Sequence, residues 1–153
     1  MEEIKNDIES GMMISEILKY LPHRHPFLLI DRIIKIDKTN SAAGYKNISN
    51  NEPYLKRNSA QKLIFPETLI IESMSQIGAV AILSRPIYKG KIMLFAGIDE
   101  FKIYRQVFPG DSLVTQVQQV YLKNNLGKMK AVSKVQEELA AEGFLSFAIA
   151  DSV

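Results

Sequence analysis

Residues 66–83 read PETLIIESMSQIGAVAIL, and this stretch decides the fold. Pro66 suits the first helical turn, where its missing N–H has no intrahelical partner, and Glu67 favours the positive end of the helix dipole. A helix that is hydrophobic on nearly every side is a buried one, so we predict a central helix that ends before Pro86 and Gly90. Its apolar side chains are Leu69, Ile70, Ile71, Met74, Ile77, Val80 and Ile82.

The rest of the chain has the composition of strands, with β-branched and aromatic runs bounded by Gly, Pro, Asn or Asp. A single long helix after the second strand cannot make a doubly wound sheet, which needs helices between its strands. We therefore predict an α+β fold, with a curved antiparallel sheet of about six strands wrapped around one long central helix. The predicted strands are 27–36, 42–48, 93–104, 113–122, 128–136 and 144–150, with a short helix near 15–21, a loop over 50–62 and turns at 109–110, 124–127 and 137–143.

Composition bounds the class of protein. The chain has 153 residues, 46% of them hydrophobic, so we expect one domain with a core of its own. With 19 basic and 17 acidic residues the net charge is +2, too balanced for a nucleic-acid or a dedicated membrane surface. There is no cysteine, which excludes disulfides, thiolate metal sites and cysteine nucleophiles. Residues 1–10 do not resemble a secretory signal and no apolar run reaches the roughly 18 to 20 residues that cross a bilayer, so we expect a cytoplasmic protein.

Three polar residues follow one another at i, i+4 spacing on the apolar helix. Thr68, Glu72 and Gln76 therefore form one ridge on one helix face. Burial of an unpaired carboxylate is costly or raises its pKa, so Glu72 requires an explanation. Either this carboxylate lies at an edge or pairs with a lysine, or it is an acid or base that desolvation tunes in an apolar site. We favour the second interpretation.

Several separate blocks carry a family resemblance. They are LPHRHPFLLIDR at 21–32, NEP at 51–53, FAGID at 95–99, VFPGD at 107–111 and the stretch 127–135. At this spacing the chain resembles the FabZ-type beta-hydroxyacyl-acyl carrier protein dehydratases from Leu21 nearly to its C-terminus. The resemblance implies one hotdog domain over 1–153, paired into homodimers or hexamers. It also implies an acyl substrate on the phosphopantetheine of acyl carrier protein or coenzyme A, bound in a tunnel at the subunit interface, with no cofactor, metal, nucleic acid or membrane.

The chemistry of this family uses a histidine and a carboxylate. The histidine takes the proton alpha to the thioester carbonyl, and a glutamate from the partner subunit's central helix protonates the departing hydroxyl. A backbone N–H at the helix N-terminus holds the carbonyl. By this resemblance Glu72 is the glutamate, and ungapped counting puts Asn58 where the family has its histidine, so the general base is replaced. The residues that the resemblance assigns to substrate binding are Glu67, Gln76, Gly97 and Arg105.

Two of these positions oppose enolate formation. Glu67 replaces the family's glycine and brings negative charge toward the carbonyl, and Asn58 cannot take up a proton at neutral pH. Asn58 either orients a thioester or a water, or only satisfies a loop, and we favour the loop. We expect His23 to anchor the chain before the first strand and His25 to lie on the opposite side, so neither replaces the base. No third ligand stands at metal-binding spacing from them.

Three functions remain open. The one we favour is an acyl-thioester-binding protein of fatty-acid or polyketide-type metabolism that is catalytically impaired, as a non-catalytic subunit or as one half of a heterodimer with an intact paralogue. The others are an active 3-hydroxyacyl-acyl carrier protein dehydratase with a rearranged site, and an acyl-thioesterase that uses Glu72. The sequence sets neither the acyl-chain length, nor the carrier, nor the pathway, nor the partner. The basic residues that we expect to meet an acidic carrier protein or a phosphopantetheine phosphate are Lys56, Arg57, Lys62, Lys102 and Arg105.

Overall fold

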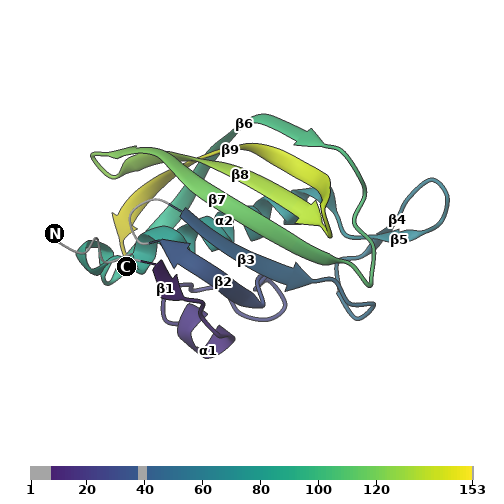
Figure 1. Cartoon of the computed structure of the whole chain (residues 1–153), viewed down its shortest axis with the longest axis horizontal. Helices are drawn as coiled ribbons and strands as arrows, with labels where there is room; N and C mark the ends of the chain where they lie inside the picture. Colours follow the sequence, from purple (N-terminus) through teal and green to yellow (C-terminus); the bar gives the residue numbers. More distant parts are fainter. Residues whose placement is uncertain (1–7, 38–40, 153) are drawn as a thin grey trace, which may run out of the picture.

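A long helix enclosed by a curved sheet dominates the computed structural model, which describes residues 8–37 and 41–152, the side chains of 8–10 excepted. The helix, α2, spans Glu67–Leu83, and the sheet wraps around it (Figure 1). This arrangement confirms both the predicted central helix and the predicted α+β architecture. Within the described residues, no helix is long and apolar enough to cross a membrane.

The described strands form one large sheet and one small ribbon. Their bounds, with those of the two short helices, are β1 (Ile8–Ser10), α1 (Ile14–Ile17), β2 (Arg32–Asp37), β3 (Ser41–Asn47), β4 (Lys56–Arg57), β5 (Leu63–Ile64), η1 (Pro86–Tyr88), β6 (Lys91–Ile103), β7 (Ser112–Lys123), β8 (Leu126–Val135) and β9 (Glu138–Asp151). The sheet has seven antiparallel strands in the order β1-β2-β3-β7-β8-β9-β6, and β4 pairs with β5 alone. After α2 the chain passes through η1 into β6. This strand lies at one edge of the sheet.

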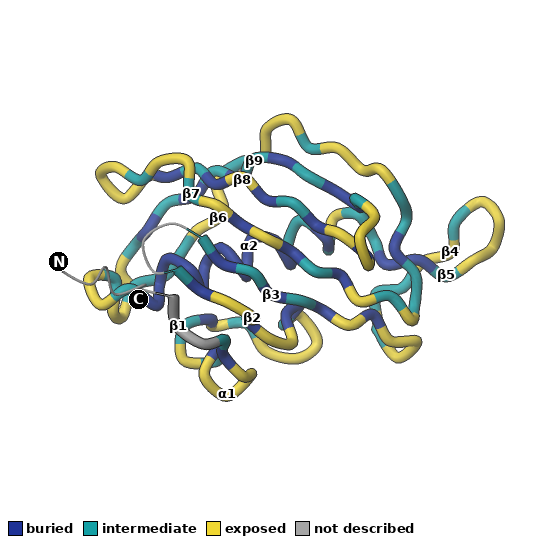
Figure 2. The backbone as a smooth tube through the Cα atoms, viewed as in Figure 1, coloured by how far each residue is buried: buried dark blue, intermediate teal, exposed yellow. Residues whose placement is uncertain are grey.

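The core lies between α2 and the inner face of the sheet. Ile70, Met74 and Ile77 are buried on the helix, and β8 alternates between buried and accessible positions along its length (Figure 2). Because successive side chains of a strand point to opposite faces, this alternation puts one face of the sheet on the helix and the other in solvent. A Cβ at Gly78 would collide with the Met129 sulfur, so the glycine allows α2 to pack closely against β8.

The first long strand is shorter than the sequence predicts. Residues 27–31 are outside any strand, and β2 begins only at Arg32. The reason is that the backbone N–H of Leu29 donates to the side chain of Gln76 on α2, at 2.8 Å, instead of to a neighbouring strand. This segment is therefore held against the helix.

The last turn and the loop before α2 also differ from the prediction. The turn predicted over 137–143 is mostly strand, because β9 begins at Glu138 and pairs with β8 on one side and β6 on the other. Ala140 and Ala141 in this stretch are fully buried, so sheet pairing and burial override the local turn preference of the polar residues beside them. The loop predicted over 50–62 contains β4.

Candidate functional site

Gln76 connects α2 to the segment that precedes β2. Its side-chain Nε2 donates to the Phe27 carbonyl at 2.9 Å and to Glu72 Oε1 at 2.8 Å, and its Oε1 accepts the Leu29 N–H at 2.8 Å. The side chain is 1% exposed. Both amide N–H groups are used within the chain, so Gln76 has no donor left for a substrate. It fixes the direction of the Glu72 carboxylate and the position of the neighbouring segment.

His23 also lies beside Glu72. Its Nε2 is 3.3 Å from Glu72 Oε1, with the two side chains 30% and 24% exposed. The expectation that His23 only anchors the chain and stays outside the site is therefore wrong. The turn that carries His23 is held by Arg24. The Arg24 guanidinium donates to the carbonyls of Leu18, at 3.3 Å, and of Leu21, at 2.7 Å, just after α1.

The two ring nitrogens of His23 have different surroundings. Nε2 faces the carboxylate, whereas Nδ1 is buried and has no hydrogen-bond partner among the described residues. A general base needs a free lone pair within reach of the proton that it removes. In this geometry the imidazole is positioned to hold Glu72, and its second nitrogen is not exposed to a substrate.

A small cavity opens in front of this cluster. It measures about 130 Å³. One wall is the face of α2 that carries Glu72 and Gln76, and the other is edge strand β6, where Leu94 and Phe95 are exposed. Binding pockets for small molecules are usually about 300 to 1,000 Å³, so this cavity is too small to enclose an acyl thioester by itself. Among the described strands β6 pairs with β9 alone, so its other edge is open to a second chain. The lining residues are His23, Glu72, Ser75, Gln76, Ala79, Met93, Leu94 and Phe95.

Asn58 lies in the turn between β4 and β5, and its side chain makes three hydrogen bonds. Oδ1 accepts the backbone N–H groups of Ala60 and Lys62, each at 3.0 Å, and Nδ2 donates to Gln106 Oε1 at 2.8 Å. These contacts confirm that Asn58 provides hydrogen-bond acceptors for the backbone of its loop. Asn58 is not among the residues that line the cavity at Glu72, so a single chain does not bring the two together.

Glu67 opens α2 and is paired with a lysine. Lys56 Nζ donates to its Oε2 at 2.7 Å. This hydrogen bond, with one from the backbone N–H of Glu67 itself and the nearby positive charge, holds the pKa of the Glu67 carboxyl below its ordinary value of 4.5. The carboxylate is therefore charged at neutral pH at the helix N-terminus, and Lys56 compensates its charge.

This pairing predicts a pH dependence of stability. A carboxyl whose pKa is lowered on folding stabilises the protein above the unfolded-state value and loses that contribution as the pH falls through the lower, folded-state pKa. We expect Lys56→Gln to destabilise the protein at about pH 6, and the difference from wild type to shrink steadily below pH 4.5. Urea unfolding at about pH 6 and below pH 4.5 measures this difference in the free energy of unfolding. Lys62→Gln, which removes an exposed charge with no ion pair among the described residues, is the control, and an equal pH dependence in both variants would contradict the pairing.

Neither Gly97 nor Arg105 lines the cavity at Glu72. Gly97 sits at an irregularity in the pairing of β6 with β9 and is partly exposed. The Arg105 guanidinium contacts Asp111 at 2.9 Å and Glu138 at 3.2 Å, so its charge is compensated within the chain. His25 lines a different cavity from His23.

Besides His23, five residues that line the cavity were not predicted as site residues, namely Ser75 and Ala79 on α2 and Met93, Leu94 and Phe95 on β6. Met93, Leu94 and Phe95 were predicted to lie in a strand, but not to line the site. A signal in the sequence was the run of apolar residues, which occupies both faces of this strand. In the structure the strand lies at an edge, and Leu94, Phe95 and Ile98 are each at least 40% exposed. Exposed apolar residues gathered at one edge are typical of an interaction surface.

Comparisons with known proteins agree with this fold. The family model described as the FabA-like domain matches residues 21–143. The 3-hydroxyacyl-acyl-carrier-protein dehydratase FabZ of Desulforamulus reducens is 48% identical over 136 residues, which cover 89% of this chain and 96% of that protein. FabZ of Herpetosiphon aurantiacus is 44% identical over 140 residues, 92% of this chain and 99% of that protein.

Solved structures show the same architecture. A chain of the dehydratase heterocomplex ApeI:P from Xenorhabdus doucetiae superimposes with a TM-score of 0.76 at 17% identity, over 89% of this chain and 91% of that one. The hot-dog-like protein from Thermanaerovibrio acidaminovorans does so with a TM-score of 0.61 at 14% identity, over 73% and 82% of the two chains. These matches establish the hotdog fold, and the family match with the FabZ relatives shows that this chain belongs to the FabA-like family.

Proposed function

We propose that this chain is a FabZ-type acyl-thioester-binding protein whose own dehydration chemistry is impaired. The observation that carries the proposal is Asn58, whose amide makes two hydrogen bonds within its loop and one to Gln106, and has no group that takes up a proton at neutral pH. The FabZ relatives act, by name, on 3-hydroxyacyl chains carried on acyl carrier protein. The same class of thioester is the ligand that we propose here.

The chemistry of dehydration explains why this position matters. A base removes the proton at Cα, that electron pair forms the C=C bond, and the C–O bond at Cβ breaks as an acid protonates the departing hydroxyl to water. Glu72 suits the acid, because the Gln76 and His23 contacts fix its direction beside an open cavity. The other half of the reaction has no base at position 58, so we expect binding without efficient turnover.

We further propose that a second chain completes the site. The cavity at Glu72 is small and opens along β6, whose exposed Leu94 and Phe95 suit an apolar interface. A homodimer, alone or as three pairs in a hexamer, would enclose the thioester but would place Asn58 at both sites. A heterodimer with an intact paralogue would place that paralogue's histidine opposite Glu72, and would account for a retained acid beside a lost base.

The carrier is proposed to be an acidic acyl carrier protein or coenzyme A. Of the basic residues expected to meet the carrier, Arg57, Lys62 and Lys102 are exposed and remain for it, because Lys56 and Arg105 are engaged by carboxylates of the chain itself. Exposed cations favour a polyanionic partner through association rate and orientation more than through affinity.

A second candidate function is dehydration with His23 as the base. The observation in its favour is the 3.3 Å contact between His23 and Glu72, which puts an imidazole and a carboxylate at one cavity within a single chain. It requires that Nε2 turn from the carboxylate to the substrate, since Nδ1 is buried.

Hydration of a crotonyl thioester, the reverse reaction, separates the two candidates. We expect the purified chain to bind crotonyl coenzyme A in calorimetry and to hydrate it no faster than Glu72→Gln does. Rapid hydration that His23→Gln abolishes, and that the control His25→Gln retains, would replace the first proposal with the second. Rapid hydration that survives His23→Gln, or the absence of thioester binding, would contradict both.

A further inference from the structure

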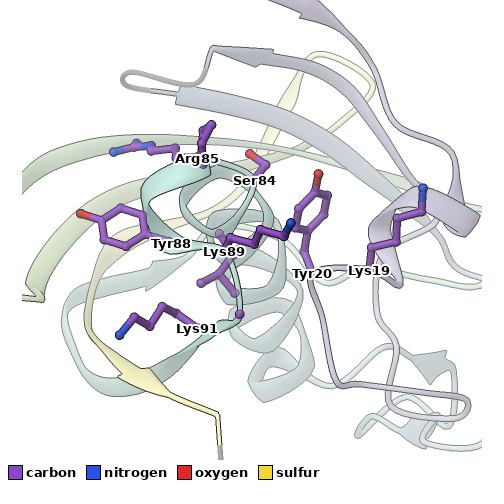
Figure 3. A pocket seen from close by; sticks show the side chains of 10 residues that line it. Lys19, Tyr20, Ser84, Arg85, Tyr88, Lys89 and Lys91 are labelled. Atoms are coloured by element: carbon purple, nitrogen blue, oxygen red, sulfur yellow. The ribbon is translucent and has the colours of Figure 1, made fainter.

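A second cavity lies at the opposite end of α2 from Glu72. It measures about 430 Å³ and is formed where the helix ends and η1 leads into β6 (Figure 3). Glu72 and Leu83 are separated by 11 positions along the helix, which corresponds to about 16 Å at 1.5 Å per residue. Gly90, at φ 76, lets the chain turn into β6 here. The cavity is therefore distinct from the site at Glu72. It is lined by Lys19, Tyr20, Leu83, Ser84, Arg85, Pro86, Tyr88, Lys89, Gly90 and Lys91.

The charged side chains that line this cavity are of one sign. Four of its lining side chains are cationic, and none of the lining residues is acidic. Lys91 is compensated by Asp151. Lys19 and Lys89 have no ion pair among the described residues, and Figure 3 shows the Lys89 side chain extending between Ser84 and Tyr20, with Arg85 and Tyr88 directed to the other side. The uncompensated Lys89 ammonium group lies beside the Tyr20 ring, and Lys19 lines the cavity on the other side of Tyr20 with its side chain directed away from the ring.

The walls between these charges are mainly apolar. Leu83 is buried beneath the cavity, and the rings of Tyr20 and Pro86 form its sides. Its volume falls within the usual range for a small-molecule site, about 300 to 1,000 Å³. A hydrated inorganic anion would leave such walls uncovered, whereas an apolar body with one anionic end matches both the walls and the lysines.

We propose that this cavity binds a medium-chain carboxylate, with its alkyl body on Tyr20, Leu83 and Pro86 and its carboxylate between Lys19 and Lys89. The hydroxyl of Tyr20 is placed to donate a further hydrogen bond to that carboxylate. The site does not depend on the function proposed for Glu72, because it shares no lining residue with that cavity.

Calorimetric titration of sodium octanoate into the full chain tests the proposal. We expect saturable binding that Lys19→Gln with Lys89→Gln weakens at least tenfold. The matched control is Lys35→Gln with Lys123→Gln, which removes the same charge from exposed lysines elsewhere and is expected to change the dissociation constant less than twofold. The uncharged probe 1-octanol is expected to bind wild type and the Lys19/Lys89 variant alike.

The comparison with Glu72→Gln excludes binding at the thioester site. We expect this variant to bind octanoate as wild type does, whether or not it binds crotonyl coenzyme A. Equal octanoate affinity in wild type and the Lys19/Lys89 variant, an equal loss in the control pair, loss of octanoate binding in Glu72→Gln, or no binding of octanoate at all would each overturn the proposal.

Discussion

Asn58→His is expected to raise the rate of crotonyl-thioester hydration by at least about a hundredfold, because a positioned general base contributes about 10² to 10⁴ in rate. The substitution returns a group that exchanges protons near neutral pH to the position that faces, by our proposal, the Glu72 of a second chain. The increase should appear in kcat rather than in KM, since the thioester is bound in both proteins.

The same substitution is expected to lower stability. The Asn58 side chain makes three hydrogen bonds, two of them to backbone N–H groups of its own loop, and an imidazole cannot reproduce all three. We expect a loss of about 1 to 2 kcal/mol in the free energy of unfolding, since each such bond contributes about 0.5 to 1.5 kcal/mol.

Asn58→Ala is the matched control for both effects. It loses the same loop hydrogen bonds and supplies no base, so it should be destabilised to a similar extent with no gain in hydration. If Asn58→His is folded, binds thioester and still hydrates no faster than Asn58→Ala, position 58 does not face the reacting carbon and the proposed site is wrong.

The central helix was predictable because its signal is local. Apolar residues on nearly every side of the stretch from Leu69 to Leu83 require burial, and a buried helix among strands needs a sheet around it. The strand bounds were predicted less well, since they depend on pairing. β9 begins as early as Glu138 because both β8 and β6 hydrogen-bond to it. A local stretch of sequence does not indicate this pairing.

Of the residues that line the cavity, only Glu72 and Gln76 were predicted as site residues. The i, i+4 spacing of Glu72 and Gln76 predicted their common face, and the hydrogen bond between them confirms it. The approach of His23 could not be read in this way, because it depends on a turn pinned by Arg24 and on contacts between Gln76 and residues 47 to 49 positions earlier in the chain. The hydrogen bonds of Asn58 within its own loop were predictable, since its partners Ala60 and Lys62 are two and four residues away.

Gln76→Leu should be among the most destabilising single substitutions in the chain, with an expected loss of about 3 kcal/mol or more in the free energy of unfolding. Leucine is close to glutamine in volume, so packing changes little. The buried N–H of Leu29 and the partly buried carbonyl of Phe27, however, both lose their partner, and an unsatisfied buried group costs about 1 to 3 kcal/mol. Guanidinium unfolding measures the loss.

Ser73→Ala provides the matched comparison one turn away. The Ser73 hydroxyl donates to the carbonyl of Leu29 at 2.8 Å, so its removal leaves one acceptor of the same segment unsatisfied, and the expected loss is about 1 kcal/mol. The difference in the free energy of unfolding between the two variants isolates the contribution of the Gln76 clamp. This clamp is the pair of hydrogen bonds between the Gln76 side chain and the backbone of Phe27 and Leu29, on either side of Leu28. Since this clamp also directs the Glu72 carboxylate, Gln76→Leu should weaken crotonyl-thioester binding even at temperatures where it remains folded, whereas Ser73→Ala should bind as wild type does. Equal stability and equal binding in the two variants would show that Gln76 does not position the site.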